Sequence, residues 1–370
     1  MKIIKKNKLI NYLSMKIYII TIHCIHNFGS IFQSYGLVKY LRDQGYDANL
    51  VDYRPAYYSK GRSVIRRVIS IATHPFSYLQ QSHKYQSFIN KYIPKTKKVY
   101  HNLQELYKLG EEDAVFVAGG DQLWNSFHMC GRDDSYKLTF VKNRKKIAYG
   151  TSMGRNSFSE DELKIVAEKI ADFTSIGLRE QSTVTMLQPF TPTNVYHAVD
   201  PVILLSKQHY MQFVGNKRLI KEPYMLVYLA NKSIILSQLV KKVSLTRNLK
   251  IAHVCGVRKK CDYDYFLKST GPEDLLNLIY YADFVVSASF HATLFSLLFN
   301  KQFYALLPEA GTNTRIEDLL SFYSLSNRII KSVEDIQTID VNEDLDFSEV
   351  NSKMINFVNV SKAELNKVLQ

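Results

Sequence analysis

The sequence has few of the residues that build disulfide frameworks, membrane spans or nucleotide loops. Its 370 residues include 4 cysteines, none of them in a CxxC pair, which predicts reduced thiols rather than a disulfide frame or a zinc site. No apolar run approaches the roughly 20 residues of a membrane-spanning helix. Neither a Walker A sequence nor a GxGxxG fingerprint occurs, so the common nucleotide-binding signatures are absent. We expect no metal ion and no cofactor.

Acidic residues are outnumbered by basic ones. The chain has 48 lysines and arginines against 34 aspartates and glutamates, which gives a formal net charge of +14 at pH 7. This balance favours anionic partners such as phosphorylated substrates, acidic glycans or an anionic membrane surface. The positive charge is spread along the chain without a recognition motif, so we expect no nucleic-acid partner.

The N-terminal stretch Met1–Ser14 is rich in lysine and lacks the apolar core of a signal peptide. The sequence leaves open whether Met1 or Met15 is the true start. Because this stretch does not look like a signal peptide, we expect a cytoplasmic protein. The basic charge of the chain also leads us to expect a peripheral contact with the inner face of the cytoplasmic membrane.

Short apolar runs alternate with helical patterns along most of the chain, beginning with an Ile-rich strand over Met15–Ile25. Such alternation is typical of a parallel sheet covered by helices, and the chain length favours two domains. We predict an α/β fold of two Rossmann-like domains facing a cleft, over 15–214 and 215–350. A C-terminal helix over 351–370 is expected to pack back on the domain junction. The basic, aromatic stretch 54–98 is interpreted as a helical excursion, either a solvated face or a lid over an acidic ligand.

The stretch from Val285 to Phe299 joins an apolar strand to a helix whose first turn holds His291. A helix that follows a buried strand offers free backbone N–H groups to an anion, and Ser287 or Ser289 can cap it. His291 would then donate a proton or a hydrogen bond to that anion. The competing interpretation is a satisfied histidine of the core.

Two loops after other predicted strands are further candidates. The first offers polar groups at an electropositive helix terminus, from Asn27, Gly29, Ser30 and Gln33. The second combines a glycine pair, an acid, two amides and the only tryptophan, in Gly119, Gly120, Asp121, Gln122, Trp124 and Asn125. This composition indicates a sugar-facing loop in which Asp121 acts as a base toward a hydroxyl. A tight turn with a capping aspartate explains the same residues equally well.

Two arginines complete the set of candidates. Arg179 ends a predicted strand, where its guanidinium can hold a carboxylate or a phosphate through two hydrogen bonds. The alternative is an ordinary ion pair between Arg179 and Glu180 at the start of a helix. Arg315 opens a later helix and is a further cationic candidate.

Six short motifs occur in one order along the chain. They are NFGS followed by QSY from Asn27, AGGDQLWN from Ala118, KIAYGTS from Lys146, LREQS from Leu178, DPV from Asp200 and SFHAT from Ser289. In this order they resemble the bacterial polysaccharide pyruvyl transferase family, over about Met15 to Arg328. The resemblance implies a GT-B-like fold and transfer of pyruvate from phosphoenolpyruvate to a glycan or a lipid-linked oligosaccharide, as a cyclic ketal. It also implies Arg179 and His291 at the donor and Asp121 near the acceptor.

Two other functions share these features. A GT-B glycosyltransferase of exopolysaccharide biosynthesis would use a nucleotide-sugar donor in the same fold, and it would bind the nucleotide through dispersed contacts. A non-catalytic glycan-binding or membrane-binding protein could keep the fold, but it would have no need of His291, Arg179 and Asp121 together.

Overall fold

The computed structural model describes residues 15–59, 75–155, 157–229, 232–254, 261–307 and 315–370. The chain divides into two compact units. The first takes its described residues from the ranges 1–64, 89–205 and 357–370, and the second takes its own from 65–88 and 206–356.

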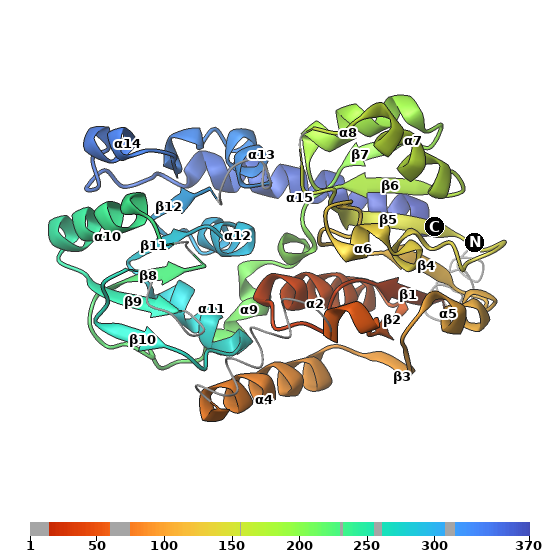
Figure 1. Ribbon diagram of the computed structural model, residues 1–370, viewed down its shortest axis with the longest axis horizontal. Helices are drawn as coiled ribbons and strands as arrows, with labels where there is room; N and C mark the ends of the chain where they lie inside the picture. Colours follow the sequence, from red (N-terminus) through yellow and green to blue (C-terminus); the bar gives the residue numbers. More distant parts are fainter. Residues whose placement is uncertain (1–14, 60–74, 156, 230–231, 255–260, 308–314) are drawn as a thin grey trace, which may run out of the picture. The chain divides into compact units, whose positions relative to one another are not determined.

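The first unit is organised around a parallel sheet of 7 strands in the order β3-β2-β1-β4-β5-β6-β7 (Figure 1). Its strands are β1 (Lys16–Ile20), β2 (Asp47–Tyr53), β3 (Lys95–Tyr100), β4 (Val115–Ala118), β5 (Lys146–Thr151), β6 (Ser175–Leu178) and β7 (Val195–His197). The central strands are apolar on both faces, as parallel strands covered by helices must be. The chain reverses its direction of winding between β1 and β4, and an open α/β sheet holds its ligands at such a switch point.

Helices and short 3-10 turns connect these strands. The α-helices of this unit are α2 (Phe28–Asp43), α5 (Leu103–Gly110), α6 (Met129–Arg132), α7 (Glu160–Lys169) and α8 (Gln181–Leu187). The 3-10 turns are η1 (Ala56–Ser59), η2 (Asp134–Lys137), η3 (Gln188–Phe190) and η4 (Pro201–Leu204). Of these elements, the N-terminus of α2 and the turn η4 lie next to the candidate site described below.

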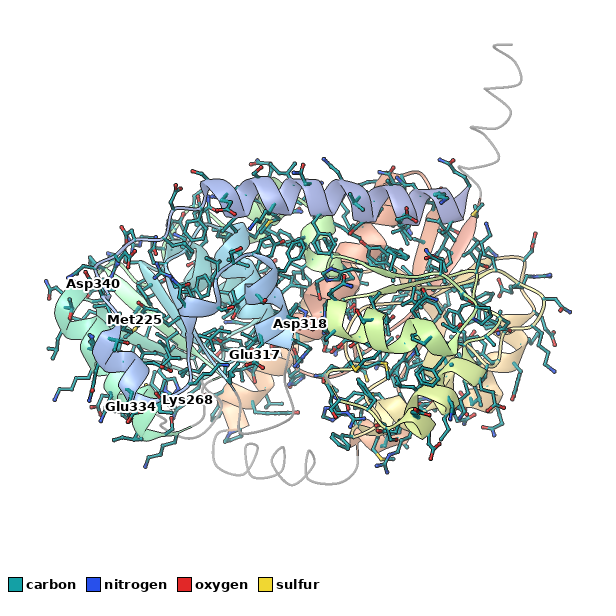
Figure 2. All side chains as sticks on the ribbon, turned by 90° about the horizontal axis from the view of Figure 1, so that it is seen from above. Met225, Lys268, Glu317, Asp318, Glu334 and Asp340 are labelled. Carbon is teal, nitrogen blue, oxygen red and sulfur yellow. The ribbon has the colours of Figure 1, made fainter. Side chains whose placement is uncertain are left out.

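The second unit has a parallel sheet of 6 strands in the order β10-β9-β8-β11-β12-β13. Its strands are β8 (Tyr224–Tyr228), β9 (Lys250–Val254), β10 (Tyr265–Leu267), β11 (Phe284–Ser287), β12 (Phe303–Leu306) and β13 (Ile329–Ile330). Apolar side chains such as Met225 fill the interior, and charged ones such as Glu334 and Asp340 lie at the surface (Figure 2). Both sheets therefore have the strand order of a Rossmann fold, which confirms the predicted α/β class with two Rossmann-like domains.

The helices of the second unit are α9 (Lys207–Val214), α10 (Ile234–Arg247), α11 (Pro272–Tyr281), α12 (Phe290–Leu298), α13 (Arg315–Phe322) and α14 (Val333–Thr338). The division between the units falls after Leu205, earlier than the predicted boundary at 214. The reason is that α9 packs within the second unit. Tyr210 of α9 meets Phe295 edge-on, with ring centroids 5.1 Å apart.

Two helices contribute residues to both units. In α4 (Pro75–Tyr92), residues up to 88 belong to the second unit, where Lys84 forms an ion pair with Asp274 at 2.6 Å. In α15 (Ser348–Leu369), which begins earlier than predicted, residues from 357 belong to the first unit. There the Ser361 hydroxyl accepts a hydrogen bond from the Val199 N–H at 3.1 Å.

The stretch 54–98 is not the purely helical excursion that the sequence predicts. Its described part contains η1 and most of α4, but from Lys95 it forms the edge strand β3, which pairs in parallel with β2. The strand was missed because its sequence, KTKKVY, is charged rather than apolar. Lysines are frequent on edge strands, where they discourage pairing with other chains. Arg62, Arg66 and Arg67 of this stretch lie outside the described residues.

The sequence predicts that the chain has no membrane-spanning helix and that its cysteines are reduced. Across the described ranges, no helix combines the length and the apolar character needed to cross a membrane. Cys24, Cys130 and Cys261 carry thiols rather than disulfide bonds. Cys255 and the stretch Met1–Ser14 lie outside the described residues.

Candidate functional site

Asp121 lies at the carboxyl edge of the first sheet, just after β4 and beside the switch point. Its backbone forms an isolated parallel bridge with Thr151 and accepts a hydrogen bond from the Ser152 N–H at 2.9 Å. These contacts hold Asp121 at a φ of 81°, in a region that side chains other than glycine seldom adopt. Such strained backbone is frequent at functional positions.

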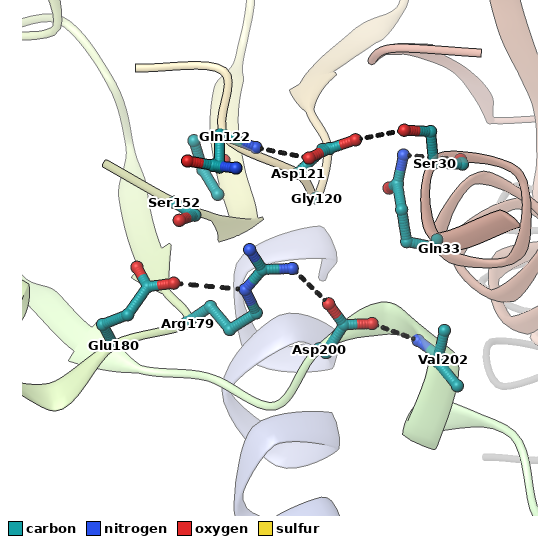
Figure 3. A network of polar contacts seen from close by, with 12 residues as sticks. Ser30, Gln33, Gly120, Asp121, Gln122, Ser152, Arg179, Glu180, Asp200 and Val202 are labelled. Carbon is teal, nitrogen blue, oxygen red and sulfur yellow. Dashed lines mark hydrogen bonds and ion pairs between the residues drawn. The ribbon is translucent and has the colours of Figure 1, made fainter. Parts of the chain in front are cut away.

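The Asp121 carboxylate accepts two hydrogen bonds inside the first unit (Figure 3). The Ser30 hydroxyl donates to Oδ2 at 2.5 Å, and the Gln122 N–H donates to Oδ1 at 2.8 Å. Asp121 as a whole residue is 8% exposed. Asp121 is therefore a fixed and nearly buried acceptor, aimed by the N-terminus of α2.

The N-terminus of α2 is built by the predicted residues themselves. Asn27 is the N-cap, and its Oδ1 accepts hydrogen bonds from the Gly29 N–H at 2.9 Å and the Ser30 N–H at 3.3 Å. The Gln33 amide donates to the Thr21 hydroxyl at 2.8 Å and to the Ser30 carbonyl at 2.9 Å. The structure thus brings Asn27, Ser30, Gln33 and Asp121 into one network, and Asn27 acts in it as a helix cap.

Close packing favours glycine at both positions before Asp121. A Cβ atom on Gly120 would lie 2.7 Å from Gln33 Oε1 and 3.0 Å from the Pro201 ring. On Gly119 it would lie 3.2 Å from the side chains of Ile19 and Thr21. The pair therefore lets the Asp121 loop pass tightly over the sheet edge.

Trp124 requires a correction, because it does not face a sugar. Its side chain is fully buried, its indole N–H donates to the Tyr136 carbonyl at 3.0 Å, and its ring meets Phe173 edge-on. Asn125 is also buried, and its amide donates to Gln122 Oε1 at 2.8 Å. Both residues shape the loop from within the protein.

Arg179 lies between two carboxylates (Figure 3). Its Nε donates to Glu180 Oε1 at 3.2 Å and its Nη1 donates to Asp200 Oδ2 at 2.6 Å, and all three side chains are about 2% exposed or less. Burial by itself would lower the pKa of Arg179, but the nearby charges of Asp200, Glu180 and Asp121 raise it above its usual value. The guanidinium charge is thus matched within the protein, and Asp200 in turn caps η4 by accepting from the Val202 N–H at 2.9 Å.

The sequence analysis missed a second polar cluster, which surrounds the buried Asp52 carboxylate. His23 Nε2 lies 3.1 Å from Asp52 Oδ1, and Arg54 donates to both oxygens of Asp52 at 2.6 and 3.0 Å. Lys95 lies 3.1 Å from the same carboxylate. Burial would raise the pKa of Asp52, but His23, Arg54 and Lys95 together hold it well below its usual range. The sequence signal that could have predicted this cluster is that His23 and Asp52 each follow an apolar run.

In the second unit, His291 lies at the carboxyl end of β11, in the first turn of α12. Ser289 is the N-cap, with its hydroxyl accepting from the Ala292 N–H at 3.3 Å. The Ser287 hydroxyl donates to the Tyr228 carbonyl at 2.6 Å. Ser289, rather than Ser287, therefore caps the helix, as one of the two predicted possibilities.

The structure also brings Arg315 to this edge of the second unit. The Phe290 ring lies perpendicular to the His291 ring, with centroids 5.1 Å apart. The guanidinium carbon of Arg315 lies 5.8 Å from the centroid of the same phenylalanine ring. His291 is 8% exposed. The candidates of the second unit thus gather around Phe290, and those of the first unit gather around Asp121.

Solved structures similar to this chain include UDP-N-acetylglucosamine 2-epimerases. UDP-N-acetylglucosamine 2-epimerase from Rickettsia bellii aligns with a TM-score of 0.57 at 11% identity, covering 96% of this chain and 97% of that one. Staphylococcus aureus MnaA with UDP aligns with a TM-score of 0.51 at 10% identity, and the alignment covers 87% of this chain and 86% of that one. UDP-GlcNAc 2-epimerase from Methanocaldococcus jannaschii, in complex with UDP-GlcNAc and UDP, aligns with a TM-score of 0.50 at 11% identity. The alignment covers 94% of this chain and 93% of that one. At such identities the likeness shows the fold, two Rossmann-like units of the GT-B type.

The sequence comparison is more specific than the fold. Among curated proteins, none matches the sequence significantly. The family described as polysaccharide pyruvyl transferase matches residues 27–309, a range that covers well over half of the chain and includes Asp121, Arg179 and His291. The chain therefore belongs to the polysaccharide pyruvyl transferase family.

Proposed function

We propose that this protein transfers pyruvate from phosphoenolpyruvate to a sugar of a cell-surface polysaccharide, or of its lipid-linked precursor, and closes a cyclic ketal. The observation that carries the proposal is the family match over residues 27–309, which includes three polar groups at the carboxyl edges of parallel sheets. Such edges are where α/β enzymes hold their substrates.

The reaction needs an acid, a base and a seat for an anion. A proton is added to the methylene carbon of phosphoenolpyruvate, and positive charge develops on the neighbouring carbon, which bears the phosphate oxygen. One sugar hydroxyl attacks that carbon and loses its proton, and phosphate leaves with the electrons of the broken C–O bond. A second hydroxyl of the same sugar then attacks the same carbon and closes the ketal, and its proton passes to the departing phosphate.

In this proposal His291 supplies the proton to the methylene carbon. An imidazole ordinarily titrates near neutral pH, which suits a general acid. The N-terminus of α12 and the side chain of Arg315 add positive charge for a phosphate or a carboxylate. Arg179 as a direct ligand of the donor stays a prediction, because the contacts described above engage it with Glu180 and Asp200.

In the same proposal Asp121 receives the proton of the attacking hydroxyl. Its carboxylate is already fixed by Ser30 and Gln122, so little reorganisation is needed when the acceptor binds. Fixed polar groups at the reacting position are a large source of catalysis.

Ligand-dependent stability tests the donor directly. A ligand that binds the folded protein at about 100 times its Kd stabilises it by roughly 2.7 kcal/mol. We therefore expect phosphoenolpyruvate to raise the melting temperature, and pyruvate or inorganic phosphate alone to raise it less. Stabilisation by UDP-N-acetylglucosamine with no effect of phosphoenolpyruvate would contradict the proposal.

A second candidate function is a GT-B glycosyltransferase that uses a nucleotide-sugar donor. The observation that favours it is the fold shared with enzymes whose structures hold UDP. The same melting experiment distinguishes it, since a nucleotide-sugar enzyme responds to UDP-sugars and not to phosphoenolpyruvate.

We also propose that the protein acts at the inner face of the cytoplasmic membrane. The motive is the basic charge of the chain, +14 at pH 7, which an anionic lipid surface attracts. Replacing Arg62, Arg66 and Arg67 by serine should reduce co-sedimentation with anionic vesicles at low salt. Unchanged sedimentation of this variant would refute the role of these arginines.

A further inference from the structure

A small apolar ledge stands at the surface of the first unit, next to the Asp121 loop. Phe127 is 60% exposed and Met129 is 56% exposed, although both are large apolar side chains. Single exposed apolar residues are common on proteins, but neighbouring ones next to a polar site often mark a binding surface. The side chains of these two residues take no part in the hydrogen bonds that build the candidate site.

Phe127 is held firmly from one side. The guanidinium carbon of Arg155 lies 3.9 Å from the centroid of the Phe127 ring and 4.5 Å from that of Phe158. Arg155 itself is buried, and its Nη2 donates to the Ser126 hydroxyl at 2.8 Å and to Glu162 Oε1 at 2.6 Å. The guanidinium covers one face of the Phe127 ring, and the exposed fraction of the residue indicates that much of the rest is open to solvent.

A chain of hydrogen bonds joins the ledge to Asp121. The Phe127 N–H donates to Asn125 Oδ1 at 3.1 Å, and the Asn125 amide donates to Gln122 Oε1 at 2.8 Å. The Gln122 N–H in turn donates to Asp121 Oδ1 at 2.8 Å. The ring and the carboxylate are thus fixed by one continuous loop of the same unit.

We propose that Phe127 is the stacking surface of an acceptor subsite, on which the apolar C–H face of a pyranose ring packs. The inference rests on the proposed function, because it takes the acceptor to be a glycan and Asp121 to be the group that meets its hydroxyl. A pyranose has an apolar face and a rim of hydroxyls, so it suits an open aromatic face beside polar groups. A ring fixed from behind by Arg155 loses little freedom when a sugar binds.

Saturation-transfer NMR titrations of the full chain test the subsite with a defined set of probes. These are the methyl α- and β-glycosides of glucose, galactose, mannose and N-acetylglucosamine. We expect at least one of them to bind the native protein, and Phe127→Ala to weaken that binding about threefold to tenfold. Phe127→Tyr should retain most of the affinity because it keeps the aromatic face.

Phe76→Ala is the matched control, since Phe76 is 86% exposed and lies on α4, outside the first unit. It should leave the affinity for glycosides unchanged. Binding of phosphoenolpyruvate is measured in parallel. Its absence would refute the proposed donor without affecting the comparison of Phe127→Ala with the native protein.

Four results would overturn the inference. The first is that the native protein binds none of the glycosides, and the second is that Phe127→Ala binds them as the native protein does. The third is that Phe76→Ala loses as much glycoside affinity as Phe127→Ala. The fourth is that the only defect of Phe127→Ala is weaker sedimentation with anionic vesicles. The last would assign the ledge to a lipid surface. Melting temperatures near the native value in all variants ensure that a loss of binding is not a loss of fold.

Discussion

The carboxyl edges of the two sheets differ in how their charges are held. In the first unit, Arg179 is bound between two buried carboxylates, and the Asp52 carboxylate contacts Arg54, Lys95 and His23, so these buried charges have partners inside the protein. In the second unit, the described edge carries serine hydroxyls, His291, Arg315 and a helix N-terminus. We infer that the first edge is built to orient a neutral, hydroxyl-bearing acceptor, and the second to receive an anionic donor.

The sharpest way to test this comparison is to remove one reactive group from each edge. His291→Ala and Asp121→Gly should each lower the transfer rate by ~10²–10⁴-fold, the usual cost of losing a positioned acid or base. Glycine is chosen at 121 because it tolerates the φ of 81° without strain. Rates are measured by phosphate release, with melting curves for both variants.

His291→Gln separates two roles for the histidine. Glutamine can still donate a hydrogen bond to a donor phosphate, but it cannot transfer a proton. An active His291→Gln enzyme would assign His291 to binding, and inactive Ala and Gln variants with native melting would assign it to proton transfer. A folded His291→Ala enzyme with native turnover would contradict a catalytic role and favour the interpretation of His291 as a structural residue of the core.

Arg179→Met should have the next largest effect, and it should appear in stability. It leaves Glu180 and Asp200 buried without their cation, and breaking a buried ion pair on one side costs about 3–5 kcal/mol. Urea unfolding measures the loss. Lys164→Met is the control, because Lys164 and Glu160 form an exposed pair on α7, for which about 0–1 kcal/mol is expected. Equal losses in both variants would show that the Arg179 cluster is not a structural centre of the first unit.

The smallest expected effect is a pH dependence that belongs to the first unit. Burial lowers the pKa of His197 to about 4, although a hydrogen bond with the Arg179 carbonyl opposes this in part. The unfolded chain, with an ordinary histidine pKa of 6.5, binds a proton between these values that the folded protein does not. The free energy of unfolding should therefore fall as the pH is lowered from about 6.5 to about 4.

His197→Phe should remove that part of the pH dependence, because phenylalanine does not titrate and can keep the contact with Phe357, whose ring centroid lies 4.4 Å from that of His197. Urea unfolding of both proteins between pH 4.5 and 7.5, a range set by the ordinary histidine pKa of about 6.5, gives the comparison. Identical pH slopes would show that His197 is not the group that titrates.

The sequence predicts most of the frame and less of the site. Apolar runs separated by helical patterns indicate parallel strands, because such strands are buried on both faces. The same rule fails to predict β3, because the lysines of this edge strand interrupt its apolar pattern. It also fails to predict the contact between His23 and Asp52. Each of these residues follows an apolar run, and their contact depends on the pairing of β1 with β2. Trp124 was misread because its burial depends on Tyr136 and Phe173, which are distant in sequence.

Formation of the product in D2O tests the proposed reaction most directly. Phosphoenolpyruvate is incubated with the native enzyme and the methyl glycosides used above, and phosphate release and proton NMR are followed together. We expect phosphate to appear in proportion to a new ketal whose methyl group carries one deuterium, because the added proton comes from a group that exchanges with solvent. A ketal methyl without deuterium would contradict protonation by such a group. Consumption of a UDP-sugar with phosphoenolpyruvate left intact would contradict the pyruvyl transfer itself.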